Sequence, residues 1–196
     1  FGDHRDLHYP LRRQRQMCIR DRSEYLSPIC PEYERPVSAV IDFIENRSDL
    51  NSTKVAIWGV SLGGYYAPRA ASYDDRISAC ISLTGPFNWK NVYDRIPGLT
   101  KEAFIYRSKC ENDDEAREFA NRMDLSECAK NITCPLYIVG GGLDRVVPPE
   151  ESKLLAEAVK GDVTYNFIED GSHVANNRIY KYRNQSADWL SSIICN

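Results

Sequence analysis

Long apolar runs are missing from this sequence of 196 residues. No stretch approaches the roughly 20 consecutive apolar residues that a membrane-spanning helix needs, and the first residues lack the apolar core of a signal peptide. An excess of either charge is missing as well, because 25 basic residues face 28 acidic ones, for a net charge of −3. We therefore expect neither a membrane nor a nucleic acid as partner.

A regular cysteine framework is also missing. The seven cysteines show no C-x-x-C spacing, and their number is odd. This pattern indicates mostly reduced thiols, so we expect a cytoplasmic protein. A disulfide between Cys110 and Cys128, across a helical segment, is the alternative.

Residues 1–22 differ in composition from the rest of the chain. They hold six arginines, no lysine and three aspartates, so this head carries +3 and the remaining residues carry −6. The string Met17-Cys18-Ile19-Arg20-Asp21 resembles translated sequencing-adapter read-through. We interpret the head as foreign to the domain and exclude it from fold reasoning. A basic arm that binds a partner is the alternative.

The patterns in residues 23–196 predict one α/β domain. Segments with helical spacing alternate with short apolar runs that predict strands at 55–58, 77–83, 135–140 and 163–168. Strands and helices that alternate in this way form a mostly parallel sheet with flanking helices.

The segment 87–131 has a different texture, since it is charged, carries scattered aromatic residues and shows no strand alternation. We expect a helical insertion that lies over the site as a lid, with helices near 100–107 and 113–123. A charged, solvated face is the alternative. Some residues in and just before this segment are candidates for lining a pocket: Gly85, Phe87, Trp89 and residues 104–106. The alternative is that they belong to the core.

The run Gly59-Val60-Ser61-Leu62-Gly63 follows the first predicted strand and precedes an alanine-rich helix. It fits the G-x-S-x-G pattern of a nucleophile elbow, in which a sharp, strained turn lifts the serine hydroxyl clear of the sheet. The Leu62 backbone N–H then points to where an oxyanion forms. A plain strand-to-helix turn with a serine cap is the alternative.

A serine nucleophile needs a base, and His173 is the only histidine outside the head. It follows the last predicted strand, and Asp144 follows the strand before it. Because the carboxyl ends of parallel strands meet at one edge of a sheet, Asp144 is the best candidate for the acid that orients His173. Asp170, three residues before the histidine, is the second candidate. The order serine, aspartate, histidine is the α/β-hydrolase order.

Three further stretches carry a family resemblance: residues 33–43, which lead toward the elbow, 144–148 and 170–177. With the elbow they resemble the FrsA-like esterase and dihydroxypseudooxynicotine hydrolase group of α/β-hydrolases, over about residues 23–194. The resemblance implies a triad of Ser61, Asp144 and His173 without a metal or organic cofactor. It also implies hydrolysis beside the carbonyl of a small molecule, at an ester or at a carbon–carbon bond of a ketone, and a homodimer.

The sequence departs from that group before the elbow, where no His-Gly-Gly-like segment occurs. The relatives carry there helical cap elements, the first strands of the sheet and the loop with the second oxyanion donor. We therefore expect an N-terminally truncated hydrolase with weak activity. A prolyl-oligopeptidase-like exopeptidase and a non-catalytic hydrolase fragment are the alternatives.

Overall fold

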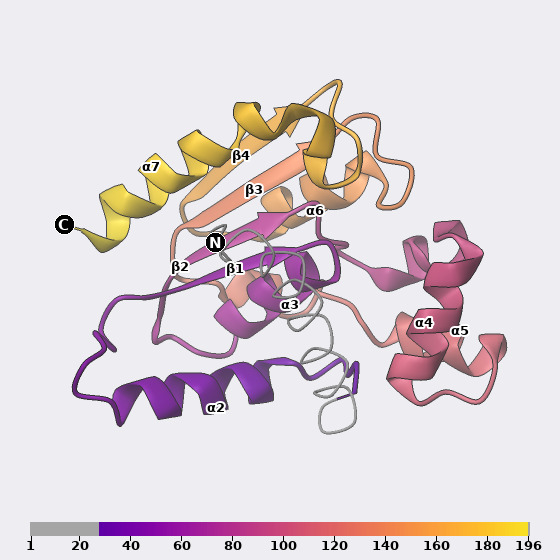
Figure 1. Ribbon diagram of the computed structural model, residues 1–196, viewed down its shortest axis with the longest axis horizontal. Coiled ribbons are helices and arrows are strands. Elements are labelled where there is room, and N and C mark those ends of the chain that lie inside the picture. Colours follow the sequence, from indigo (N-terminus) through magenta and orange to yellow (C-terminus); the bar gives the residue numbers. More distant parts are fainter. Residues whose placement is uncertain (1–27, 196) are drawn as a thin grey trace, which may run out of the picture.

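The computed structural model describes residues 28–195 and contains one parallel sheet of four strands. Neighbours in the sheet are also neighbours in the chain (Figure 1), in the order β1 (Val55–Val60), β2 (Ile77–Leu83), β3 (Leu136–Gly141) and β4 (Val163–Ile168). The predicted parallel α/β architecture is confirmed, and strand limits differ by at most two residues. The predicted head lies outside the described residues.

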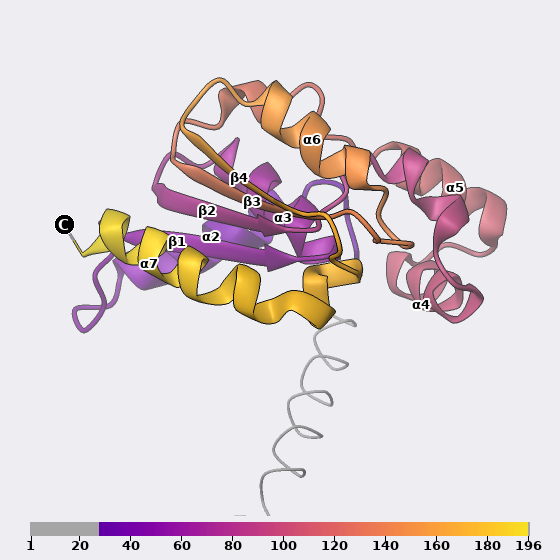
Figure 2. The same ribbon diagram turned by 90° about the horizontal axis from the view of Figure 1, so that it is seen from above.

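Helices cover both faces of the sheet. One core cluster joins α2 (Glu34–Glu45), α3 (Leu62–Ala71) and α6 (Pro149–Ala158) to one face, through side chains such as Tyr65 and Leu155. The other cluster joins α7 (Arg183–Ile194) to the opposite face. Figure 2 shows α6 and α7 on opposite sides of the strands. The two central strands, β2 and β3, are apolar because these layers shield both of their faces from water.

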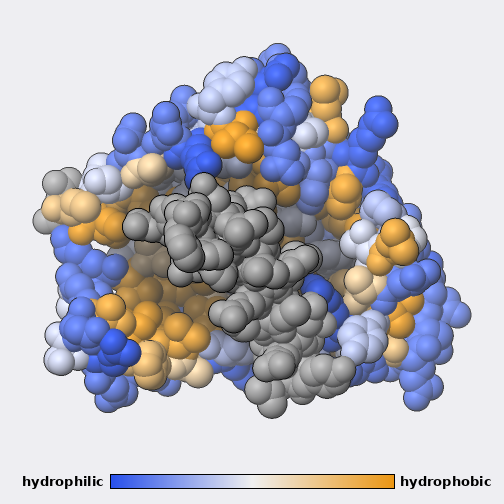
Figure 3. All heavy atoms as spheres, in the orientation of Figure 1, coloured by the Kyte–Doolittle hydropathy of each residue, from blue (hydrophilic) through white to orange (hydrophobic). Residues whose placement is uncertain are grey.

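One edge of the sheet is formed by β1, and its side chains are unusually exposed for an apolar strand. Trp58 and Val60 keep 44% and 43% of their surface in contact with solvent. Figure 3 shows apolar side chains gathered where Figure 1 draws α2 and β1. A hollow of about 280 Å³ lies there, lined by residues such as Val37, Ile44 and Ile57.

The segment 87–131 forms a separate helical layer made of α4 (Gly98–Ser108), α5 (Asp113–Asn121) and short 3₁₀ turns. It lies beyond the carboxyl ends of the strands in both ribbon views (Figures 1 and 2). Its interior is aromatic, because Phe104 stacks on Trp89 with ring centroids 5.2 Å apart. Both are buried, as is Phe87, so these residues belong to the core.

The last predicted helix is wrong in its first part. Instead of one helix after His173, an irregular 3₁₀ segment, η4 (His173–Lys181), precedes α7. Val174 and Ala175 adopt left-handed backbone conformations there, with φ of 62° and 46°, so no continuous helix can form.

The alternative of a disulfide between Cys110 and Cys128 is wrong, because both are free thiols.

Candidate active site

Ser61 occupies a strained turn between β1 and α3. Its φ of 55° and ψ of −115° place it outside the regions that residues with a side chain normally adopt. Two backbone hydrogen bonds hold it there: its N–H donates to Leu83 O at 2.9 Å, and its carbonyl accepts from Gly64 N–H at 2.8 Å. The tip of the turn is therefore fixed to the end of β2.

The turn requires small residues, although not both of those that the motif indicates. A Cβ at Gly59 would lie 1.7 Å from Gly63 O, so no side chain fits at that position. A Cβ at Gly63 meets nothing within 4 Å. Gly64 is the second tight position, because its Cβ would lie 2.6 Å from Gly85 Cα. The close backbone approach lies one residue later than the pattern suggests.

The predicted base lies beside the serine, and the predicted acid lies beside the base. His173 Nε2 is 2.9 Å from Ser61 Oγ, and His173 Nδ1 is 2.8 Å from Asp144 Oδ2. When Nδ1–H donates to the carboxylate, Nε2 is free to accept the serine proton. The Asp144 side chain is almost fully buried, whereas that of His173 is partly open to solvent.

The Asp144 carboxylate is oriented by its own loop. Its Oδ1 accepts hydrogen bonds from the backbone N–H groups of Val146 at 2.8 Å and Val147 at 2.9 Å, which leaves Oδ2 for the histidine. A carboxylate held in this way can fix both the tautomer and the ring orientation of His173.

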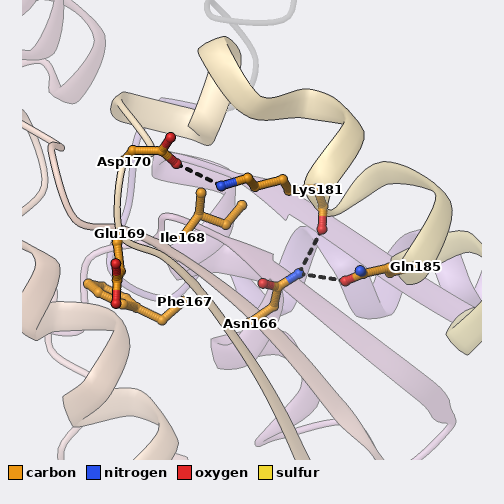
Figure 4. A pocket seen from close by; sticks show the side chains of 7 residues that line it. All are labelled: Asn166, Phe167, Ile168, Glu169, Asp170, Lys181 and Gln185. Atoms are coloured by element: carbon orange, nitrogen blue, oxygen red, sulfur yellow. Dashed lines mark hydrogen bonds and ion pairs between the residues drawn. The ribbon is translucent and has the colours of Figure 1, made fainter.

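Asp170, the second candidate for the acid, binds other partners. Its carboxylate accepts from Lys181 Nζ at 2.9 Å and from Arg178 Nε at 2.6 Å, and these two cations lower its pKa. The contact with Lys181 lies in a polar cavity along β4 (Figure 4), together with Asn166 and Gln185. Asp170 therefore holds the η4 segment to the end of β4.

Thr84 is a contact of the histidine loop that the sequence does not reveal. It directly follows β2 with a φ of 44°, an outlier for a β-branched residue. Its Oγ1 accepts a hydrogen bond from Val174 N–H at 3.2 Å, so it ties the backbone beside His173 to the sheet. A strand followed by Thr-Gly-Pro predicts a turn, but no local pattern predicts this long-range bond.

The predicted oxyanion donor, Leu62, is the first residue of α3. The N–H groups in the first turn of a helix have no acceptor within that helix, and they lie at the positive end of its dipole. This position suits the N–H of Leu62 to stabilise negative charge beside Ser61.

Two features are absent from residues 28–195, a membrane-spanning helix and a cluster of metal ligands. No helix there is long and apolar enough to cross a membrane. No group of three or more histidine, cysteine, aspartate or glutamate side chains there is arranged to hold a metal ion.

The parallel sheet and the chain order of Ser61, Asp144 and His173 are those of the α/β-hydrolase class. Within that class, the chain belongs to the prolyl oligopeptidase family, whose sequence model matches residues 36–194.

The chain is also similar in sequence and in structure to individual known hydrolases. The 2,6-dihydropseudooxynicotine hydrolase of Paenarthrobacter nicotinovorans is 32% identical over 168 residues, which cover 85% of this chain and 45% of that protein. The crystal structure of 2,6-dihydroxy-pseudo-oxynicotine hydrolase superposes with a TM-score of 0.81 at 30% identity, over 88% of this chain and 49% of that one. The resemblance read from the sequence is thereby confirmed at the level of the family.

A more distant structure shares the fold alone. The acylaminoacyl peptidase of Pyrococcus horikoshii superposes with a TM-score of 0.61 at 21% identity, over 79% of this chain and 27% of the peptidase. This chain spans about half the length of the two hydrolases described above.

Proposed function

We propose that this chain is a serine hydrolase that acts on a small carbonyl compound, with Ser61 as nucleophile, His173 as base and Asp144 as orienting acid. The single observation that carries the proposal is the pair of hydrogen bonds at 2.9 Å and 2.8 Å that links the three side chains. Each residue follows a different strand of the sheet, so this contact is not a product of local sequence.

The proposed reaction starts with attack of Ser61 Oγ on the carbonyl carbon while His173 Nε2 takes the hydroxyl proton. The tetrahedral oxyanion accepts a hydrogen bond from the Leu62 N–H, and Asp144 stabilises the imidazolium. When the bond to the leaving group breaks, His173 returns the proton to the leaving oxygen or, for a ketone substrate, to the leaving carbon. Water then hydrolyses the acyl-enzyme by the same steps in reverse.

The oxyanion donor proposed for residues 28–195 is the N–H of Leu62. Efficient acyl transfer normally uses two or more such donors, and loss of one costs about 10²–10³ in kcat. Gly59 is the only glycine between residue 28 and Ser61, so no glycine-rich loop in that stretch supplies a second N–H. We expect clear reactivity of Ser61 toward an activated electrophile.

The substrate class rests on the relatives. The hydrolase that matches 85% of this chain is named for 2,6-dihydropseudooxynicotine, which favours a small organic substrate over a polypeptide. The match to the prolyl oligopeptidase family supports a second candidate, an exopeptidase that cleaves amide bonds. A protein that keeps the three side chains without turnover is the third candidate.

The first experiment tests whether Ser61 is a nucleophile. A fluorophosphonate probe should label the wild type, and S61A should remain unlabelled. S78A, which changes a serine in β2 bonded to Thr53 O, serves as the matched control and should label like the wild type. Absence of labelling in the folded wild type contradicts the proposal and favours the non-catalytic candidate.

The second experiment sorts the substrate classes. Turnover of an aryl ester, a β-diketone and an Xaa-Pro amide is measured side by side, with S61A as the blank. We expect the ester or the diketone to be cleaved fastest. An amide activity that exceeds both would replace the proposed carbonyl substrate with a peptide.

A further inference from the structure

Glu151 is a deeply buried carboxylate outside the three proposed catalytic residues. It lies in the first turn of α6 with only 2% of its surface exposed. A buried carboxylate is costly unless donors surround it. Glu151 Oε2 accepts from the N–H groups of Phe87 at 2.9 Å and Asn88 at 2.8 Å, and Oε1 accepts from Asn91 Nδ2 at 2.9 Å.

All three donors belong to one short stretch of chain, Phe87–Asn91, which begins the helical layer 87–131. The same stretch is paired with the other end of that layer, since Trp89 N–H donates to Met123 O and Leu125 N–H donates to Phe87 O. Glu151 is therefore bonded to the first residues of the helical layer, and these are in turn paired with Met123 and Leu125, which follow α5.

The backbone just before this stretch contacts the candidate active site. Gly85 packs against Gly64 in the first turn of α3, and Thr84 accepts the hydrogen bond from Val174 beside His173. Glu151 itself follows Asp144 along the loop that leads into α6. The chain from Thr84 to Asn91 thus has contacts with the segments that carry all three proposed catalytic residues.

We propose that Glu151 is a positioning residue, whose carboxylate locks Phe87–Asn91 in place and so holds the helical layer 87–131 over the substrate side of the site. This inference rests on the proposed hydrolase function. Because Glu151 touches none of the three proposed catalytic side chains in any of its hydrogen bonds, its loss should alter substrate binding more than the reactivity of Ser61.

The test exchanges donor and acceptor in the hydrogen bond between Asn91 and Glu151. N91D replaces the donor to Oε1 with a second carboxylate, so the two side chains repel each other. Adding E151Q restores the contact, because the amide oxygen can accept the two backbone N–H groups while the amide NH₂ donates to the new carboxylate. E150Q removes the same charge from an exposed neighbour in the same turn and is the matched control. N91A, which only deletes one hydrogen bond, is the milder second variant.

The kinetic readout is the split between KM and kcat for an aryl acetate and an aryl octanoate. For N91D we expect a rise of about tenfold in the KM for the octanoate, which corresponds to about 1.4 kcal/mol. We expect changes of less than about twofold in kcat, in the KM for the acetate and in the rate of fluorophosphonate labelling. In N91A the KM for the octanoate should rise by about a third as much as in N91D. In N91D/E151Q this KM should be close to that of the wild type, and in E150Q it should be the same as in the wild type.

A readout without catalysis separates this inference from the proposed function. Amide hydrogen exchange should accelerate across 87–131 in N91D and slow again in N91D/E151Q, whether or not the wild type turns over any ester. If the wild type fails to label, the proposed function fails while the exchange data still test the lock. The positioning role is overturned if exchange in 87–131 is unchanged in both N91D and N91A, if the double variant is not rescued, or if kcat and labelling fall together with binding.

Discussion

The two ends of the sheet are built differently. At the carboxyl ends of the strands, the backbone adopts left-handed conformations in Ser61, Thr84, Val174 and Ala175. Backbone hydrogen bonds and close glycine contacts hold the strained residues there, and the carboxylates of Asp144, Glu151 and Asp170 fix the loops around them. At the amino ends the backbone is ordinary, and charged side chains make the connections. Arg76, just before β2, binds Asp74, Asp42 and Glu45 at 2.7 Å each.

The carboxyl ends of the strands carry the proposed catalytic residues, whereas the contacts at the amino ends only stabilise the fold. Strained backbone costs free energy and persists only where surrounding contacts fix it, so it concentrates where side-chain direction matters. Ion pairs near the surface tolerate adjustment and contribute little individually. We therefore expect substitutions at the carboxyl ends to remove activity or the fold, and substitutions at the amino ends to produce small, pH-dependent losses of stability.

The largest effect is expected for D144N at the carboxyl end. The amide cannot hold the Nδ1–H tautomer of His173, so kcat should fall about 10⁴-fold with little change in the melting temperature. Ester turnover and a thermal melt measure the two quantities. D170N is the matched control for the loss of a carboxylate and should retain most of the activity. A similar loss in D170N would mean that Asp170, and not Asp144 alone, supports the histidine.

The next effect concerns the elbow backbone. G59A should destabilise the protein by about 4 kcal/mol or more, because the new methyl group overlaps the Gly63 carbonyl. G63A adds the same methyl group where nothing lies within 4 Å, so its stability should stay within about 1 kcal/mol of wild type. Urea denaturation gives both values. Equal stabilities of G59A and G63A would contradict the packing at this turn.

A smaller effect is expected at the amino end, at Asp74. Hydrogen bonds from Arg76 lower the pKa of this buried carboxyl from 3.8 to about 2. Because the folded-state value lies below the unfolded one, the stabilisation is present above about pH 4 and is lost as the pH falls toward 2. D74N should lose about 1–2 kcal/mol at pH 7. The difference from wild type in denaturation curves should shrink as the pH falls from about 4 through 2. A difference that is constant with pH would exclude this ionisation as its cause.

The smallest effect is expected for E45Q. Glu45 is one of three carboxylates on Arg76, and its side chain is 44% exposed. Solvent and salt screen such a pair, and Asp74 and Asp42 remain to bind the guanidinium. The melting temperature should not change measurably at physiological salt. A clear decrease would show that the amino end depends on its full set of charges.

The sequence predicts the strands, which show as local apolar runs, and the base, because all other histidines lie in the head. Apolar runs mark the four strands, and the scarcity of histidine leaves His173 as the only candidate base outside the head. Asp144 and Asp170 both follow strands, and position alone favours Asp144, the residue that lies beside the histidine.

Other features cannot be predicted locally because they arise from distant contacts. A glutamate in the first turn of a helix normally faces water, and only the packing of 87–131 on α6 buries Glu151. The same reason hides the bond between Thr84 and Val174. The irregular η4 segment reads as helical because left-handed conformations at Val174 and Ala175 have no signature in those residue types.

The hydrogen bond between Ser61 and His173 joins residues 112 positions apart, contributed by the turns after the first and the last strand. Each strand pairs with its successor in the chain, so these two turns reach their final distance only when β1 to β4 have all assembled. In a refolding experiment, the fraction of molecules that react with the fluorophosphonate probe should therefore count completed sheets. Far-ultraviolet dichroism, which detects helices formed earlier, should recover before it.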